Sequence, residues 1–213
     1  MNTAMPPGCE LILVSILKGG CRKSTTAMLL AFGLAQRGDE VLLVDADAAT
    51  QGVVDWASRV YAAGHELPFH VVQWTQSLGL LVPFVQAQAR QTNARWVIVD
   101  VGGEAPEVVR QAVLIADRVL VPTGAEQAEL GRVAPTAQLI RSAGKPMSIL
   151  LNRVPAPGVG IAKTVREVLT ADGYSVLKTE IPQNRELYAH VWGTIPAQLG
   201  AYEQLRDELV EVQ

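Results

Sequence analysis

The stretch LILVSILKGGCRKSTT, residues 11–26, decides how this chain is expected to fold. Its first part, Leu11–Leu17, is apolar without polar alternation, which suits a strand covered on both faces of a parallel sheet. Two glycines follow, and helical spacing begins after Lys23 and Ser24. A strand, a glycine-containing turn and a helix that opens on Lys-Ser are typical of a phosphate-binding loop, where backbone N–H groups and the helix N-terminus hold an anion.

The rest of the chain repeats this alternation of apolar runs and helical stretches. Helical spacing covers Thr25–Arg37, which stops at Gly38, then Thr50–Tyr61, and then Gln127–Ala143, which stops at Gly144. Alternating strands and helices predict an α/β three-layer sandwich with a mostly parallel twisted sheet. The other apolar runs lie at Val41–Val44, Phe69–Trp74, Trp96–Val99, Arg118–Val121, Ser148–Leu151 and, more weakly, Ser175–Lys178.

Size and composition fit a single globular domain. The chain has 213 residues, of which 49% are hydrophobic and 18% are charged, and its formal charge is −3. We expect one domain over residues 11–213 behind a flexible tail of residues 1–10. The acidic balance excludes a protein that coats nucleic acid with its whole surface, so any DNA contact needs a local patch. Two cysteines, Cys9 and Cys21, exclude a disulfide framework and an iron–sulfur cluster.

Nothing in the sequence predicts export or a membrane span. Residues 1–10 contain no basic stretch followed by an apolar one, so they do not resemble a signal peptide. The run Leu11–Leu17 is far shorter than the roughly 20 residues that a helix needs to cross a bilayer. The expected location is therefore the cytoplasm.

Carboxylates follow the second and fourth apolar runs of the chain. The second run ends in Asp45-Ala46-Asp47, and the fourth run, WVIVD, ends at Asp100 before Gly102-Gly103. Open α/β sheets bind their ligands at these carboxyl ends of the strands. A hydrophobic strand that ends in Asp has the Walker B form, which holds the Mg²⁺ shell. The structural alternative for Asp45 and Asp47 is capping of the helix over Thr50–Tyr61.

Together these motifs resemble those of the ParA/MinD family of deviant Walker A ATPases, over Leu11 to about Val210. The phosphate loop is similar to the pattern Lys-Gly-Gly-x-Gly-Lys-Ser/Thr, with Arg22 in place of the glycine before Lys23. A side chain at that position either strains the loop or adds a cationic contact to the phosphates, and both alternatives stay open. The segment Leu150–Val154 resembles the Asn-Arg segment of the family, and the fold class that the resemblance implies is a deviant P-loop NTPase.

The resemblance implies a role for each motif residue toward ATP and Mg²⁺. The implied catalytic residues are Lys23 on the phosphates, Asp47 on the attacking water, and Lys18, which reaches the partner's phosphates across a nucleotide-sandwich dimer. The implied metal ligands are Ser24 and Asp100, the latter through water. The implied ATP-binding residues are Lys18, Gly19, Gly20, Cys21, Arg22, Lys23, Ser24, Thr25 and Asn152, where Asn152 contacts the adenine edge.

The implied function is that of a small ParA-type partition ATPase. Its ATP-bound homodimer would hold nonspecific DNA and associate with the nucleoid. A ParB-type adaptor on a plasmid or chromosome cargo would then stimulate an otherwise slow hydrolysis. Nonspecific DNA binding needs cations that face phosphates, and the candidates in the C-terminal third are Lys163, Arg166, Lys178 and Arg185.

Three alternatives share the same loop. The first is a regulatory or positioning protein that binds nucleotide but has little ATPase activity because of Arg22. The second is a small-molecule ligase, for which no sequence feature identifies a substrate pocket. The third is a membrane-bound MinD-like protein, which needs a basic amphipathic C-terminal helix. Because Leu199–Gln213 carries Glu203, Asp207, Glu208 and Glu211 against Arg206 alone, we expect no membrane partner.

Overall fold

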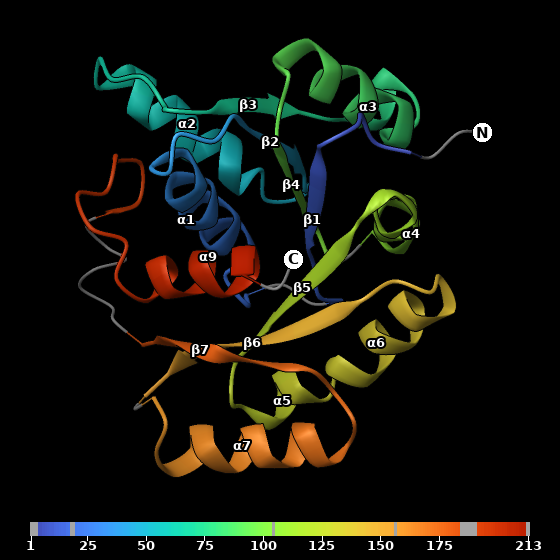
Figure 1. Cartoon of the computed structure of the whole chain (residues 1–213), viewed down its shortest axis with the longest axis vertical. Coiled ribbons are helices and arrows are strands. Elements are labelled where there is room, and N and C mark those ends of the chain that lie inside the picture. The colour runs from blue at the N-terminus through green and yellow to red at the C-terminus, as the bar shows by residue number, and fades with distance from the viewer. Residues whose placement is uncertain (1–3, 18–19, 104, 156, 184–190, 212–213) are drawn as a thin grey trace.

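The computed structural model describes residues 4–17, 20–103, 105–155, 157–183 and 191–211. Within these residues, a seven-stranded sheet lies between two layers of helices (Figure 1). The strand order is β3-β2-β4-β1-β5-β6-β7, and every neighbouring pair of strands is parallel. This arrangement confirms the predicted α/β fold class.

Each of the predicted apolar runs overlaps one strand. The strands are β1 (Glu10–Val14), β2 (Val41–Ala46), β3 (His70–Gln73), β4 (Trp96–Val101), β5 (Arg118–Thr123), β6 (Met147–Val154) and β7 (Val176–Pro182). The helices are α1 (Lys23–Ala35), α2 (Gly52–Ala62), α3 (Leu81–Thr92), α4 (Pro106–Ile115), α5 (Gln127–Leu130), α6 (Val133–Ser142), α7 (Gly160–Ala171) and α9 (Ala201–Glu211), with a short 3₁₀ helix, η1, at Gln76–Leu78.

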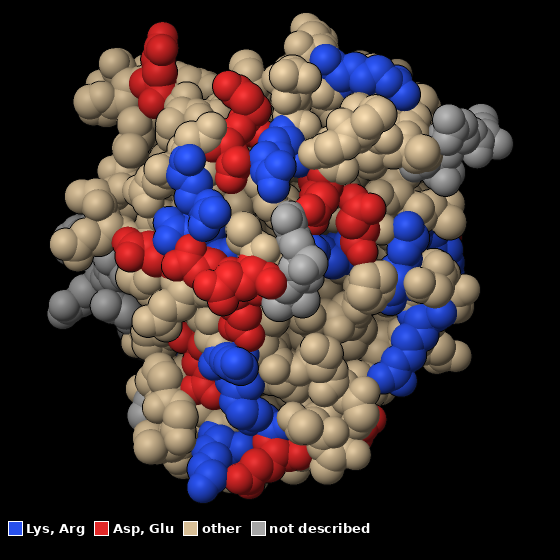
Figure 2. All heavy atoms as spheres, viewed as in Figure 1, with Lys and Arg blue, Asp and Glu red and all other residues tan. Residues whose placement is uncertain are grey.

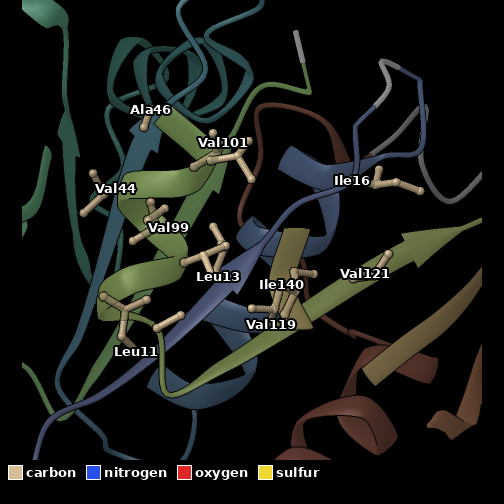
Figure 3. Close-up of a cluster of buried hydrophobic side chains, with 14 of the residues drawn as sticks. Leu11, Leu13, Ile16, Val44, Ala46, Val99, Val101, Val119, Val121 and Ile140 are labelled. Carbon is tan, nitrogen blue, oxygen red and sulfur yellow. The ribbon is translucent and has the colours of Figure 1, made fainter. Parts of the chain in front are cut away.

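Alternate side chains of the central strands enter two different cores. In β1, Leu11 and Leu13 pack with residues of α3, α4, α6 and α7, whereas Ile12 and Val14 pack with residues of α1, α2 and α9. Figure 3 shows the first of these cores, with Leu11 and Leu13 of β1 among side chains of β2, β4 and β5 and with Ile140 of α6 near Val119. Burial on both faces is the physical reason that the apolar runs lack polar alternation.

Helix α1 is buried on nearly all sides rather than along the single stripe that its spacing predicted. It lies against the sheet and also contacts α2 and α9. It begins at Lys23, two residues before the predicted start at Thr25, so that Lys23 and Ser24 lie in its first turn. Gly38 follows the helix with φ of +84°, which confirms the predicted stop.

The helix predicted over Gln127–Ala143 is wrong as one element, because two helices occupy this stretch. Helix α5 ends at Leu130, and α6 begins at Val133. Pro135 explains the break, since it has no N–H to donate to the carbonyl of Gly131 and its ring clashes with that carbonyl in a continuous helix. In the structure Pro135 lies in the first turn of α6, where no such hydrogen bond is needed.

Both ends of the described chain pack against the domain. Strand β1 takes in Glu10, Cys9 is buried, and the Ala4 carbonyl accepts a hydrogen bond of 2.9 Å from Gln86 Nε2. Ala4, Cys9 and Glu10 thus contact the domain, and the flexible tail predicted for residues 1–10 stays a prediction.

At the other end, α9 buries Tyr202, Leu205 and Leu209 against the core around α1. Its Glu208 carboxylate accepts hydrogen bonds from the backbone N–H groups of Lys178 and Thr179 on the edge strand β7. The apolar side of α9 is thus used within the fold. None of the helices in the described part of the chain has the length and apolar character of a bilayer span.

Candidate nucleotide site

The phosphate loop and two carboxylate-bearing strand ends meet at one edge of the sheet. Strand β1 lies in the middle of the sheet, between β4 and β5. Val14 at the end of β1 is the register partner of Asp100 on β4, and Asp100 is in turn the partner of Asp45 on β2. Because parallel strands end at the same edge, the turn after β1 stands beside both carboxylates, as expected for a ligand site of an open α/β sheet.

A cavity of about 360 Å³ opens at this edge. Part of its lining comes from segments that the sequence predicted, namely the phosphate loop, the loop after β2 and Gly102-Gly103 after β4. The predicted site residues in the lining are Gly20, Arg22, Lys23, Ser24, Thr25 and Asp47. Lys18 and Gly19 lie outside the described residues, so their predicted roles stay predictions.

Arg22 occupies a backbone conformation that favours glycine. Its φ is 55° and its ψ is 39°, the left-handed region, and it forms the N-cap of α1 without a side-chain capping hydrogen bond. A left-handed residue with a Cβ costs about 1–2 kcal/mol. The predicted strain is therefore present in the backbone, while Arg22 also lines the cavity.

Replacing Arg22 with glycine should stabilise the fold. We expect the free energy of unfolding to rise by about 0.5–1 kcal/mol, because the relieved left-handed strain exceeds the greater backbone entropy of glycine in the unfolded chain. Urea denaturation at equilibrium measures this change. Gln51→Gly is a matched control, since Gln51 is exposed and forms the left-handed N-cap of α2 with φ of 48°. A lower stability of Arg22→Gly would show that the Arg22 side chain outweighs the strain.

Asp47 is held in one orientation by the loop that follows it. Its Oδ1 accepts hydrogen bonds from the N–H groups of Ala49 (3.1 Å) and Thr50 (3.2 Å), and its Oδ2 accepts one from Thr50 Oγ1 (2.9 Å). A Cβ on Gly102 would lie only 2.6 Å from Asp47 Oδ1, so glycine is needed there. The turn at Thr50 also explains why α2 begins at Gly52 rather than at Thr50.

The hydrogen bonds of Asp45 confirm, for this residue, the alternative that it caps the helix after β2. Its Oδ2 accepts hydrogen bonds from the N–H groups of Val53 (3.1 Å) and Val54 (3.0 Å) in the first turn of α2, and its Oδ1 accepts one from Asp47 N–H (3.0 Å). Burial raises the pKa of Asp45, against the effect of these hydrogen bonds. Asp45 therefore fixes the start of α2 and the loop before it.

Asp100 is fully buried, and neither of its carboxylate oxygens has a partner at full hydrogen-bond geometry among the described residues, although the Ser24 hydroxyl lies near enough to act on its pKa as a weak donor. Burial above all raises its pKa to about 7, and the Asp45 and Asp47 charges add to the shift, while Ser24 and Lys23 act against it. A buried carboxylate without hydrogen bonds is costly unless a cation joins it.

The chemistry of these groups fits Mg²⁺. Ser24 lies close to Asp100, since its hydroxyl helps to lower the pKa of that carboxyl, and carboxylate and hydroxyl oxygens suit this ion. No group of three or more histidine, cysteine or carboxylate side chains in the described residues is arranged to hold a metal by itself. Mg²⁺ would therefore need phosphate oxygens or water as further ligands.

Asn152 lies beneath the phosphate loop and outside the lining of the cavity. It is fully buried, and its Nδ2 donates to the Cys21 carbonyl (3.4 Å) and to Thr26 Oγ1 (3.2 Å). Its Oδ1 accepts a hydrogen bond from Arg153 N–H (2.9 Å). These contacts give Asn152 a part in holding the loop, and its implied contact with adenine stays a prediction. Cys21 is also buried outside the lining.

The cations predicted to face DNA lie in different surroundings. Figure 2 shows Lys and Arg side chains over β7 and α7, at the bottom of the view, with carboxylates among them. Arg166 donates from Nε (3.0 Å) and Nη2 (2.7 Å) to Glu180 Oε1, so its charge is neutralised against the edge strand. Lys178 is exposed. Lys163 is also exposed, on α7, and its Nζ lies 4.0 Å from Glu167 Oε1. Arg185 lies outside the described residues.

The sequence did not indicate Trp192, which forms part of the cavity wall. Its indole Nε1 donates a hydrogen bond of 3.0 Å to Asp55 Oδ2 on α2, which also lines the cavity. A single Trp-Gly pair near the end of the chain carries no local signal for this role, because the contact joins residues 137 positions apart.

Comparisons with known proteins agree with this geometry. Residues 12–191 match the sequence profile described as the CobQ/CobB/MinD/ParA nucleotide binding domain. Among curated relatives, the "Maintenance of carboxysome distribution protein A" of Halothiobacillus neapolitanus is 30% identical over 200 residues, which cover 89% of this chain and 88% of that protein.

Two solved structures have the same fold. One is a putative plasmid partition protein from Borrelia burgdorferi bound to AMPPNP, with a TM-score of 0.73, 17% identity, and coverage of 96% of this chain and 98% of that one. The other is cobyrinic acid a,c-diamide synthase from Mycobacterium smegmatis with an ATP analogue and magnesium, with a TM-score of 0.72, 17% identity and coverage of 95% of each chain.

At this identity the two structures show the fold alone, and one fold serves both a partition protein and a synthase. The profile and the curated relative instead cover most of the chain, and the profile includes the phosphate loop and both carboxylate motifs. The chain is therefore a member of the CobQ/CobB/MinD/ParA family of nucleotide-binding proteins, in the ParA/MinD group that its phosphate loop resembles.

Proposed function

We propose that this protein is a ParA-type ATPase that positions a cargo by switching between an ATP-bound dimer and a monomer. The observation that carries the proposal is the convergence of the phosphate loop and Asp47 on one cavity, with the buried Asp100 beside Ser24 and Lys23 behind its lining. The curated relative supports a positioning role, because its name assigns it to the distribution of carboxysomes. Fold alone cannot separate this role from that of a synthase.

In the proposed mechanism, the chain binds and orients ATP rather than reacting with it covalently. Lys23, which is buried in the first turn of α1, contacts the β- and γ-phosphates, and the N–H groups at the start of α1 face the same charge. Ser24 and Asp100 hold Mg²⁺, which when bound neutralises charge on the phosphate oxygens. Asp47, fixed by Ala49 and Thr50, keeps one lone pair, on Oδ2, with which to orient the attacking water.

The proposed switch can be tested by the molar mass of the protein in solution. With Mg²⁺ and ATP or a non-hydrolysable ATP analogue we expect the mass of a dimer, and with Mg²⁺ and ADP that of a monomer, because Lys18 contacts the γ-phosphate of the partner. Lys18→Ala should stay monomeric with every nucleotide. Light scattering coupled to size exclusion measures this difference.

Lys145→Ala is a suitable control, because it removes an equal charge from the loop between α6 and β6, away from the cavity lining. It should dimerise like the unaltered chain. A mass that no nucleotide changes, together with absent nucleotide binding, would contradict the proposed function.

Nonspecific DNA and a ParB-type adaptor are the proposed partners of the dimer, and the nucleoid is its proposed location. Of the predicted cations, Lys163 and Lys178 remain exposed in the described residues. Two copies of such a patch in a dimer would combine weak contacts into one surface, which reconciles DNA binding with a formal charge of −3.

A second candidate is a nucleotide-binding regulatory protein of the same fold with little ATPase activity. The left-handed backbone of Arg22 favours it, because a side chain at this point of the loop crowds the phosphates. Phosphate release measured beside the molar mass separates the two candidates. A nucleotide-dependent dimer that releases no phosphate supports the regulatory protein.

A further inference from the structure

The wall of the cavity contains Trp192, whose ring packs against the buried Trp56 and so joins the C-terminal segment to α2. The rings of Trp192 and Trp56 have centroids 4.9 Å apart at an angle of 48°. Trp192 Nε1 donates to Asp55 Oδ2 (3.0 Å), and Trp56 Nε1 donates in the opposite direction to the Thr194 carbonyl (2.8 Å). Two indole N–H groups therefore fasten residues 192–194 to the first half of α2.

The residues around this pair leave little freedom for a different arrangement. Gly193 has φ of +75°, and a Cβ there would lie 2.7 Å from Arg59 Cδ. Arg59 Nε in turn donates to Asp55 Oδ2 (3.0 Å). The Arg59 guanidinium first and the Trp192 indole second hold the pKa of Asp55 below its usual range. Asp55 is thus a charged acceptor, and hydrogen bonds to charged groups are the stronger ones.

The start of α2 is confined between this pair and the predicted Mg²⁺ ligand. A Cβ on Gly52 would lie 2.8 Å from Ser24 Oγ on one side and 3.6 Å from Trp192 Cη2 on the other. The loop that carries Asp47 leads directly into Gly52. A tilt of α2 would therefore move both the loop and its carboxylate relative to the phosphate loop.

From these contacts we infer that Trp192 is a positioning residue of the nucleotide site, which holds α2 so that Asp47 faces the phosphates. The inference rests on the proposed function and assigns it a residue outside the loop motifs. Trp192 is half-buried, lines the cavity and directs its only polar atom to the cavity rim. Its effect should therefore fall mainly on the hydrolysis step, because the loop that carries Asp47 leads into α2, whereas the phosphate loop leads into α1.

Trp192→Phe tests this inference, because it keeps an aromatic ring and removes the hydrogen bond to Asp55. We expect kcat for ATP to fall about tenfold while KM and the dissociation constant of a non-hydrolysable ATP analogue change less than about twofold. Asp55→Ala removes the acceptor and leaves the indole in place, so it should lower kcat similarly. Phosphate release and titration calorimetry measure these quantities.

Tryptophan fluorescence supplies a readout that does not depend on turnover. The Mg²⁺ complex of the analogue should change the emission of the unaltered chain, and Trp192→Phe should lose most of that change. Trp96→Phe is the matched control. Trp96 is fully buried at the start of β4, at the other end of the sheet, and its Nε1 also donates to a carboxylate, Asp39 (3.3 Å). This control should keep both kcat and the emission change.

The outcomes separate the inference from the function on which it rests. If the unaltered chain binds no nucleotide, both fail. If it binds and hydrolyses ATP and Trp192→Phe retains its kcat, the inference alone is overturned. An equal loss of kcat in Trp96→Phe also overturns it, because the loss would then come from reduced stability. If Trp192→Phe does not fold, the kcat of Asp55→Ala decides in the same way.

Discussion

Replacing Lys23 with alanine is expected to weaken the binding of a non-hydrolysable ATP analogue by about 100-fold. Lys23 is only 6% exposed, lies in the first turn of α1 and lines the cavity beside the phosphate loop. In such a shielded place, solvent screens little of the attraction between a lysine and phosphates. Removing the lysine therefore leaves phosphate charge uncompensated. Titration calorimetry with Mg²⁺ and the analogue measures the change.

Lys178→Ala is the matched control for this prediction, since Lys178 is exposed on the edge strand β7 and lies outside the cavity lining. It should bind the analogue within about twofold of the unaltered chain. Because Lys23 also offsets the buried Asp100 charge, circular dichroism must show that Lys23→Ala is folded. Unchanged binding by a folded Lys23→Ala would mean that the cavity is not the phosphate site.

Replacing Asp100 with asparagine should have opposite effects on the metal-free chain and on nucleotide binding. At pH 8 without metal, we expect the free energy of unfolding to increase by on the order of 1–4 kcal/mol, because the substitution removes a buried charge that Ser24 and Lys23 offset only in part. At the same pH, Mg²⁺ with the analogue should stabilise the unaltered chain and fail to stabilise Asp100→Asn to the same extent. Thermal unfolding followed by calorimetry measures both effects.

The gain from Asp100→Asn should depend on pH in a defined direction. Burial raises the pKa of Asp100 from 3.8 to about 7 in the fold, so between these values the folded chain binds a proton that the unfolded chain releases. This contribution to stability is complete below the lower value and is lost as the pH rises toward 7. The advantage of Asp100→Asn should therefore be smallest below pH 3.8, be only part of its full size at pH 5 and be largest at pH 8.

Asp172→Asn is the control for the pH series, because Asp172 is exposed at the end of α7 and is far from the cavity lining. It should leave the stability nearly unchanged at both pH values. A loss of stability in Asp100→Asn at pH 8 without metal would contradict the assignment of Asp100 as a buried charge that its neighbours offset only in part. Such a result would also remove the main argument for Mg²⁺ at this position.

The positions of the strands along the chain could be predicted because the signal is local. An apolar run without alternation reports two buried faces, and all the predicted runs overlap strands. The helix over Gln127–Ala143 was predicted wrongly although its signal was also local, since Pro135 marks the break between α5 and α6. The single helix was predicted from the spacing of its apolar residues, and this prediction did not take Pro135 into account.

The carboxylates of the site show that a motif can predict where residues lie but not what each of them does. The pattern Asp-Ala-Asp placed Asp45 and Asp47 at the end of β2 correctly, but it could not divide their tasks. The structure gives Asp45 the cap of α2 and leaves Asp47 on the cavity, because Asp45 lies within β2, whereas Asp47 lies in the loop after it. Similarly, Arg166 carried the charge that DNA binding needs, yet Glu180 neutralises it in the fold.

The sequence by itself determined the class of fold, the phosphate loop and the strand ends that carry its carboxylates, because each depends on residues that are near one another in the chain. Only the tertiary structure decided that Asn152 lies beneath the loop and that Trp192 lines the cavity. These contacts join residues 131 and 137 positions apart, Asn152 with Cys21 and Trp192 with Asp55. No spacing along the chain encodes them, since they depend on how the sheet and helices pack.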